Sequence, residues 1–161
     1  MHPEIPATPA VRFLRAAGVD FEPMIYTYLE HGGTRNAATA LGVDEHHTVK
    51  TIVLETDKKA PLIMLMHGDR EISTRQLARA IGTKSVTPCA PETATRHTGY
   101  LIGGTSPFGT RKPLPIYAEA TLFDLPLIYI NGGRRGLLVK IAPNDLDTLL
   151  HPIRVHAAIE A

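Results

Sequence analysis

The sequence has a single cysteine, Cys89, and a formal net charge of only +1 over 161 residues. One cysteine excludes an internal disulfide framework and fits a reducing compartment, so we expect a cytoplasmic protein. The small net charge excludes a general nucleic-acid binder that works by bulk attraction to phosphates, so any nucleic-acid contact must be local. No apolar run approaches the roughly 18 residues that span a bilayer, and residues 1–9 lack a basic start followed by an apolar core. We therefore expect no membrane association and no targeting segment.

Several motifs of known chemistry are also missing. The chain contains no G-x-x-x-x-G-K-[ST], no G-x-G-x-x-G, no H-E-x-x-H and no C-x-x-C, which removes the usual sequence support for phosphate, dinucleotide and zinc sites. The adjacent His46 and His47 would point in different directions on a helix or a strand. His31 and His67 stand alone in the sequence, and we expect surface or turn positions for them. We therefore predict no metal site and no cofactor.

A protein nucleophile is not indicated either. No G-x-S-x-G elbow is present. A Ser-His-Asp or Cys-His arrangement stays open, because its members meet only in space.

Composition favours one globular unit. The chain is 43% hydrophobic and 20% charged, which suits a domain with a sizeable core. No repeat, low-complexity tract or linker interrupts the periodic segments. We therefore expect a single domain over residues 1–161.

Capping residues and apolar periodicity predict five helices. Thr8 is the expected N-cap of the first helix, and Ser73 begins a capping-box pattern, which makes Ser73 structural rather than nucleophilic. Gly18 and Gly82 would end these two helices. The expected helices cover residues 9–17, 34–41, 74–81, 91–97 and 143–150. Their expected buried stripes are Val11, Leu14 and Ala17 on the first helix and Leu77, Ala80 and Ile81 on the third.

Short apolar runs between the helices predict strands. Residues 49–54 and 62–66 are separated by a polar turn, so they are expected to form a hairpin, and Gly132-Gly133 is expected to form a tight turn. The other expected strands are 21–28, 85–87, 116–118, 127–131 and 137–141. Strands that alternate with helices but are joined in places by hairpins predict a mixed sheet in an α/β or α+β domain.

The run Thr98–Gly109 is the most informative segment. We expect Tyr100-Leu101-Ile102 to be a strand-like segment that ends in a glycine-rich turn. Glycine permits positive φ and a close approach to a ligand, and Pro107 fixes its own φ. Such a turn exposes backbone N–H groups and suits a small ligand, although a purely structural turn between strands is the alternative.

The charged residues that stand out are one lysine, a candidate site residue, and two basic pairs. Lys50 lies at the start of a segment that should be buried, so its ammonium either reaches solvent or faces a pocket. Arg111-Lys112 and Arg134-Arg135 each follow a glycine-containing turn. Ordinary solvated charge is the alternative interpretation of both pairs.

These segments together resemble the YbaK/EbsC family of free-standing aminoacyl-tRNA deacylases, which are similar to the editing domain of bacterial prolyl-tRNA synthetases. The resemblance runs in order through nearly the whole chain. It rests on four motifs: Thr8-Pro9-Ala10-Val11, Val49-Lys50-Thr51-Ile52, Thr98–Gly109 and Ile128–Leu137. It implies a single domain with a mixed, barrel-like sheet and a pocket for the aminoacylated 3′ end of tRNA.

The resemblance also implies roles for individual residues. Lys50 matches the essential lysine of the family, and Gly103 and Pro107 match its G-x-x-x-P loop. The loop N–H groups would stabilise the oxyanion of ester cleavage, with Lys50 as the cation. The substrate-binding candidates are Tyr26, Gly104, Thr105, Ser106, Pro107, Asn131, Gly132 and Gly133. The candidates for tRNA contact are Arg111, Lys112, Arg134 and Arg135.

The chain departs from the cysteine-specific members near the expected pocket. Asn131 replaces a serine, Leu138 replaces an aspartate, and an aromatic residue expected near Gly33 is absent. Asn131 still donates and accepts hydrogen bonds, whereas Leu138 carries no charge. We expect deacylation of Cys-tRNA(Pro), with prolyl-tRNA synthetase as a candidate partner. The alternatives are another small amino acid, such as alanine or serine, and a non-catalytic module that binds a nucleotide, tRNA or a synthetase.

Overall fold

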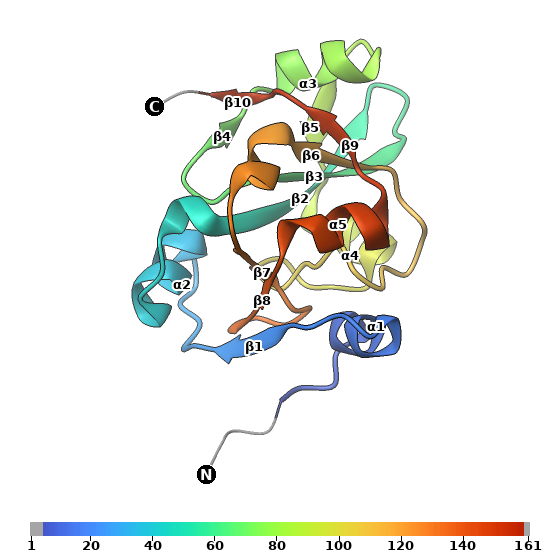
Figure 1. Cartoon of the computed structure of the whole chain (residues 1–161). Helices are drawn as coiled ribbons and strands as arrows, with labels where there is room; N and C mark the ends of the chain where they lie inside the picture. The colour runs from blue at the N-terminus through green and yellow to red at the C-terminus, as the bar shows by residue number, and fades with distance from the viewer. Residues whose placement is uncertain (1–4, 160–161) are drawn as a thin grey trace.

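The computed structural model describes residues 5–159, and the expectations for residues 1–4 and 160–161 lie outside this range. The chain folds around an eight-stranded mixed sheet (Figure 1). Its strands are paired in the order β1-β8-β7-β2-β3-β6-β9, and β5 pairs with β2 as well. The strands are β1 (Glu22–Ile25), β2 (Thr48–Thr56), β3 (Pro61–His67), β5 (Val86–Pro88), β6 (Ile116–Glu119), β7 (Ile128–Asn131), β8 (Leu137–Ile141) and β9 (Ile153–Val155). A mixed sheet in an α/β fold is confirmed.

The sheet combines antiparallel and parallel pairs. β2 and β3 form the predicted antiparallel hairpin, and β7 and β8 form another. β2 is parallel to β7, β3 to β6, and β6 to β9. A second, two-stranded sheet joins β4 (Glu71–Ile72) to β10 (Ala158–Ile159).

Within residues 5–159, five α-helices flank the sheet (Figure 1). They are α1 (Pro9–Ala17), α2 (Gly33–Leu41), α3 (Thr74–Ile81), α4 (Pro91–Thr98) and α5 (Pro143–Leu150), and two 3-10 helices span Glu45–His47 and Ala120–Asp124. Thr8 and Ser73 cap α1 and α3 as predicted. No helix within residues 5–159 has the length and apolar character needed to cross a membrane.

The sheet is buried on both faces. On β3, Ile63 and Leu65 belong to a core cluster that also holds residues of α1, α4 and α5. Met64 and Met66 face a second cluster with Leu77 of α3. Because successive side chains of a strand point to opposite faces, the continuous apolar run of β3 fits a strand covered on both sides.

Several local predictions are wrong. Tyr100, Leu101 and Ile102 form no strand, because the chain bends there into turns that follow α4. Ala17 and Ala80 are exposed, and Ala10 and Ala78 take the buried positions instead. The predicted strand over residues 21–28 is paired only over Glu22–Ile25.

Three short strands were not predicted. The strands β4, β9 and β10 contain only two or three residues each. Such segments are too short to show a period in the sequence, and partners far along the chain hold them in place.

The pairing of β2 leaves a gap along one edge of this strand. On that edge, β2 pairs with β7 only at Thr48 and Val49, and with β5 only over Leu54–Thr56. Its other edge pairs with β3 over the whole length from Val49 to Glu55. Residues 50–53 therefore lie between the ends of two neighbouring strands, where side chains from elsewhere can surround a cavity.

Candidate functional site

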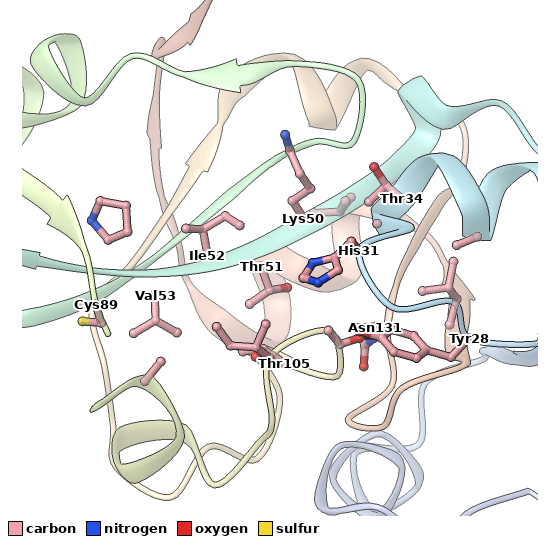
Figure 2. A pocket seen from close by; sticks show the side chains of 18 of the residues that line it. Tyr28, His31, Thr34, Lys50, Thr51, Ile52, Val53, Cys89, Thr105 and Asn131 are labelled. Carbon is pink, nitrogen blue, oxygen red and sulfur yellow. Dashed lines mark hydrogen bonds between the residues drawn. The ribbon is translucent and has the colours of Figure 1, made fainter. Parts of the chain in front are cut away.

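A cavity of about 400 Å³ opens at this gap in the sheet (Figure 2). Residues 49–53 of β2 form its floor. The remaining lining residues come from five other parts of the chain: Tyr26, Tyr28, His31, Gly33, Thr34, Ala37, Pro88, Cys89, Ala94, Ile102, Gly103, Thr105, Asn131 and Leu138. Most of this lining is apolar, with a few polar groups, which is typical of a small-molecule site.

Lys50 is a charged residue in this lining. Its side chain is 21% exposed, and its Nζ lies 3.8 Å from Oε1 of Glu71 on β4. The Glu71 side chain is 84% exposed, so solvent screens this ion pair and it holds the lysine only loosely. The ammonium is therefore free to bind an anionic group, although Figure 2 shows it pointing away from the side chains of Thr51 and Thr105.

Thr51 follows Lys50 on the floor and carries an unsatisfied hydroxyl. Among residues 5–159, its Oγ1 is the only buried side-chain nitrogen or oxygen atom without a hydrogen-bond partner. Figure 2 shows the Thr51 side chain among those of His31, Val53 and Thr105. A buried polar atom without a partner is costly and marks a position where a ligand can supply the missing hydrogen bond.

The glycine-rich loop forms the wall of the cavity at Gly103. This residue has a φ of +86°, and a Cβ there would lie 2.7 Å from the hydroxyl oxygen of Tyr28. Gly104 packs so tightly that a Cβ would lie 2.8 Å from the backbone nitrogen of Arg135. Both positions therefore need glycine, one for its backbone conformation and both for the close approach.

Asn131 fixes this loop against the turn that follows β7. Its Nδ2 donates to the carbonyl oxygen of Gly103 at 3.0 Å, and its Oδ1 accepts from the N–H groups of Gly133 at 2.7 Å and Arg134 at 3.2 Å. The Asn131 amide is therefore hydrogen-bonded to the backbone on both its nitrogen and its oxygen. These bonds join the two glycine-rich segments that contain the predicted site residues.

The structure divides the sequence-predicted site residues into two groups. Lys50, Gly103, Tyr26, Thr105 and Asn131 line one cavity. The others, Gly104, Ser106, Pro107, Gly132 and Gly133, are not among its lining residues.

The second group shapes the loops behind the cavity wall. Ser106 is fully buried, and its Oγ accepts from the N–H group of Phe108 at 3.1 Å. Gly132 donates to the carbonyl oxygen of Leu137 at 2.9 Å within the turn. We therefore assign these two residues to loop structure.

The two basic pairs lie outside the cavity and are exposed. Arg135 stays close to its mouth: its Nε donates to the carbonyl oxygen of Ile102 at 2.8 Å, and its guanidinium lies 5.2 Å from the ring centre of Tyr28. Lys112 instead contacts Nδ1 of His97 at 3.1 Å. Arg134-Arg135 is thus the pair with a structural connection to the site.

Sequence reasoning missed several lining residues. His31 does lie in an exposed turn as expected, with a φ of +62°, but it also lines the cavity. Tyr28 and Thr34 reach the cavity from either side of this turn. The alternation of Tyr26 and Tyr28, which puts both on one face of an extended segment, could have indicated the second tyrosine.

Cys89 also lines the cavity without having been assigned to it. Burial raises the pKa of its thiol, and the nearby Glu55 carboxylate, 3.9 Å from Sγ, acts in the same direction. The thiolate is the nucleophilic form of cysteine, so this environment disfavours a reactive Cys89.

Comparison with known proteins identifies relatives that are similar in sequence to this chain. EbsC of Enterococcus faecalis, which is provisionally named a Cys-tRNA(Pro)/Cys-tRNA(Cys) deacylase, is 28% identical over 143 residues, or 88% of this chain and 87% of that protein. A proline–tRNA ligase of Nitratidesulfovibrio vulgaris (strain Hildenborough) is 29% identical over 161 residues. That match covers 98% of this chain but 25% of the ligase, so this chain spans about a quarter of that relative.

Solved structures agree on the fold. A crystal structure described provisionally as a trans-editing enzyme for prolyl-tRNA synthetase superposes with a TM-score of 0.82 at 23% identity, over 97% of this chain and all of that one. The profile of the aminoacyl-tRNA editing domain matches residues 32–149, which include the whole cavity floor and both glycine-rich segments. The chain belongs to the aminoacyl-tRNA editing domain family.

Proposed function

We propose that this protein is a trans-acting deacylase that cleaves the ester of a mischarged aminoacyl-tRNA, with Cys-tRNA(Pro) as its substrate. One observation carries the proposal: Lys50 and Gly103 line the same, largely apolar cavity. The resemblance of the chain to EbsC, whose provisional name assigns it Cys-tRNA(Pro), supports the choice of substrate.

The chemistry of ester cleavage fits a site that contains Lys50 and the Gly103 loop. Attack on the ester carbonyl produces a tetrahedral species with negative charge on the former carbonyl oxygen. Backbone N–H groups at the glycine-rich loop stabilise that charge without reorganising, because Asn131 and the tight packing of Gly104 hold the loop in place. Lys50 contributes a cation toward the reacting ester or the phosphate of the terminal adenosine.

The lining favours a small aminoacyl side chain without charge. Val53, Ala94 and Leu138 lie around the cavity, and Leu138 is only 6% exposed. Thr51 offers its unsatisfied hydroxyl as the hydrogen-bond partner of a thiol, hydroxyl or amino group. One methylene changes binding in an apolar pocket by only about 1 to 3 kcal/mol, so a synthetase makes errors among small amino acids that a second enzyme must clear.

The attacking group in our proposal is the substrate thiol or a water molecule, and not a side chain of the protein. Cys89 lines the cavity, but burial raises the pKa of its thiol and so disfavours the nucleophilic thiolate. For cysteine, the substrate thiol attacks its own ester carbonyl. The new C–S bond closes a thiolactone, the C–O bond to the ribose breaks, and the thiol proton goes to the departing 3′ oxygen. For other amino acids, a water held in the cavity attacks in the same way and releases the free acid.

The partner in this proposal is the 3′ end of tRNA. In this proposal Arg135, whose guanidinium lies 5.2 Å from the ring centre of Tyr28, binds the phosphates of the terminal nucleotides. We infer prolyl-tRNA synthetase as the source of the mischarged tRNA, because proline–tRNA ligases contain a segment similar to this chain.

A deacylation panel tests the substrate. Purified protein is mixed with tRNA(Pro) charged with cysteine, alanine, serine or proline, and with tRNA(Cys) charged with cysteine, and the remaining ester is counted over time. We expect fastest loss of Cys-tRNA(Pro). Faster loss of the alanine or serine ester would reassign the amino acid, and saturable binding of all five without turnover would leave a binding module.

Substitution of Lys50 tests the site. Lys50→Ala removes the cation from the cavity, and we expect a loss of about 10²-fold in the deacylation rate, in line with removal of one stabilising group from an oxyanion site. Lys140→Ala is the matched control, since Lys140 is a half-buried lysine of the same sheet, on β8, with an equally loose ion pair, 3.7 Å to Glu22. Full activity of Lys50→Ala would remove Lys50 from the mechanism.

A further inference from the structure

His31 lies at the rim of the cavity beside β2. Of the lining residues that the structure describes, it is the one that carries an imidazole, and it is exposed. Figure 2 shows its ring pointing into the cavity, toward the side chain of Thr51. A residue that lines a cavity and is also exposed lies where the cavity meets solvent. His31 can therefore contact a bound molecule that is only partly inside the cavity.

The backbone at His31 is held in a left-handed conformation. Its φ is +62°, which few residues other than glycine adopt, although histidine and asparagine do so more readily than most. The turn is closed by the N–H group of Gly32, which donates to the carbonyl oxygen of Leu29 at 2.9 Å. Nδ2 of Asn36 donates to the carbonyl oxygen of Thr27 at 3.3 Å, and a Cβ on Gly32 would lie 2.7 Å from Cβ of Asn36. Such a conformation costs free energy, and these contacts maintain it with the imidazole directed into the cavity.

The ester of a bound aminoacyl-tRNA must lie at the mouth of this cavity. A volume of about 400 Å³ holds an aminoacyl group but not a tRNA, so the bond between the two crosses the mouth. Tyr28, three residues before His31, lies at this mouth with the Arg135 guanidinium 5.2 Å from its ring centre. The segment that contains Tyr28 and His31 therefore borders the position of the reacting ester.

Cleavage of this ester requires a group that accepts one proton and later releases it, because the attacking thiol or water loses a proton and the departing 3′ oxygen gains one. The other titratable side chains of the lining are Tyr26, Tyr28, Lys50 and Cys89. Burial raises the pKa of both Tyr26 and Cys89, which disfavours their basic forms. As classes, phenols and ammonium groups keep their protons near neutral pH. Imidazole is the side chain that can both accept and release a proton in this range.

We propose that His31 is a catalytic residue that carries the proton in the deacylation proposed above, on which this inference rests. Its unprotonated ring nitrogen takes the proton of the substrate thiol as the sulfur attacks the ester carbonyl and the C–S bond forms. When the tetrahedral species collapses, the C–O bond to the ribose breaks and the same imidazole gives the proton to the 3′ oxygen. The imidazole is thereby regenerated, and no oxidant or reductant takes part. A water molecule that attacks in place of the thiol loses its proton in the same way.

Charged groups of both signs surround His31. On its own segment and on the elements that face it, besides the lining phenols and the Cys89 thiol, they are Glu30, Arg35, Lys50, Glu71 and Arg135. Every variant proposed below keeps all of these groups. A difference in pH dependence between a His31 variant and the unchanged protein therefore reports the imidazole itself.

Single-turnover deacylation between pH 5.5 and pH 8 tests the proposal. Enzyme is used in excess over Cys-tRNA(Pro), and the rate without enzyme is subtracted at each pH. Asparagine also adopts positive φ, so we expect His31→Asn to fold, with the melting temperature as the check. At the upper end of the range we expect a rate about 10²-fold below that of the unchanged protein, as for loss of a general base. This ratio should shrink as the pH falls below about 6.5, because a protonated imidazole accepts no proton.

His151 provides the matched control. It has a φ of +48°, is exposed and ends α5, and it does not line the cavity. His151→Asn should therefore keep the rate and the pH profile of the unchanged protein. A second variant, His31→Gly, permits the same φ and leaves space for a free imidazole at the rim. We expect added imidazole to restore part of its rate and to leave that of His151→Gly unchanged.

The outcomes separate this inference from the function on which it rests. If the unchanged protein cleaves none of the esters of the deacylation panel, the proposed function fails and the role of His31 fails with it. If the unchanged protein cleaves Cys-tRNA(Pro) and His31→Asn cleaves it equally fast, only the role of His31 is refuted. A slower variant with a constant rate ratio at every pH, and without rescue by imidazole, would also refute it, since His31 would then only contact the tRNA.

Discussion

Gly103 links backbone conformation to the shape of the cavity beside β2. It combines a φ of +86° with a close approach to the Tyr28 hydroxyl, and its carbonyl oxygen is held by Asn131. The sequence indicated this residue because a glycine-rich turn with a following proline restricts the backbone. It could not indicate Tyr28, because the contact joins segments about 75 residues apart, and only the folded chain brings them together.

A substitution at Gly103 should separate the effect of its contact with Tyr28 from the effect of backbone strain at positive φ. Gly103→Ala adds a Cβ 2.7 Å from the Tyr28 hydroxyl oxygen and carries a backbone cost of roughly 1 kcal/mol or more. We expect a drop of about tenfold or more in deacylation, measured on Cys-tRNA(Pro). Gly99→Ala is the control, since Gly99 has a φ of +82° but its Cβ would meet no atom closer than 3.7 Å. Equal losses in both variants would mean that the contact with Tyr28 is irrelevant.

Among the elements, α3 begins with a capping motif in which one hydrogen bond is local and another joins distant parts of the chain. Ser73 caps the helix, with Oγ accepting from the N–H group of Gln76 at 3.2 Å. The reciprocal half of the capping box is replaced, because the N–H group of Ser73 donates to the carbonyl oxygen of Ala157 at 2.7 Å. Gln76 instead lines a cavity at the ends of β3, β6 and β9. The helix start was therefore predictable from sequence, whereas the fate of the Gln76 side chain was not.

Removal of this cap should destabilise the fold. Ser73→Ala leaves an N–H group in the first turn of α3 without its acceptor, and we expect a loss of about 1 kcal/mol in the free energy of unfolding. Urea unfolding followed by circular dichroism measures this change. Thr74→Ala is the control in the same turn, because Thr74 is exposed and makes no cap. A loss in the control as large as that in Ser73→Ala would argue against the cap.

At the scale of the whole molecule, strand ends of the sheet border cavities in two places. One cavity lies along β2, between the ends of β7 and β5, and another lies where β3, β6 and β9 end together. The expectation of surface or turn positions for His67 is wrong for this reason. It is 1% exposed at the end of β3, beneath residues of the 3-10 helix Ala120–Asp124.

Burial of His67 makes stability depend on pH. Burial lowers the pKa of its imidazole and outweighs the hydrogen bond to the His46 carbonyl oxygen, which raises it. The charge of the His46 ring lowers this pKa further, and the carboxylates of Asp69 and Glu119 raise it. As the pH falls below the usual value of about 6.5, the unfolded chain takes up a proton that the folded protein resists. Stability conferred by neutral His67 is therefore lost as the pH falls.

A substitution at His67 checks this dependence. We expect His67→Gln to be less stable at pH 7, because it breaks the bonds to His46 and Thr121, but to lose less further stability between pH 7 and pH 5. Urea unfolding across this range measures both effects. Parallel curves for the two proteins would show that His67 does not titrate in this range.

The sequence by itself determined the parts of this protein that depend on neighbouring residues. Caps such as Thr8 and Ser73, the apolar run of β3 and the glycines of the 98–109 loop act within a few residues, so their structures follow from local chemistry. Only the tertiary structure decided what surrounds Lys50 and that His67 is buried. Both cavities arise from strand pairings between distant segments, and such pairings leave no periodic pattern in any single segment.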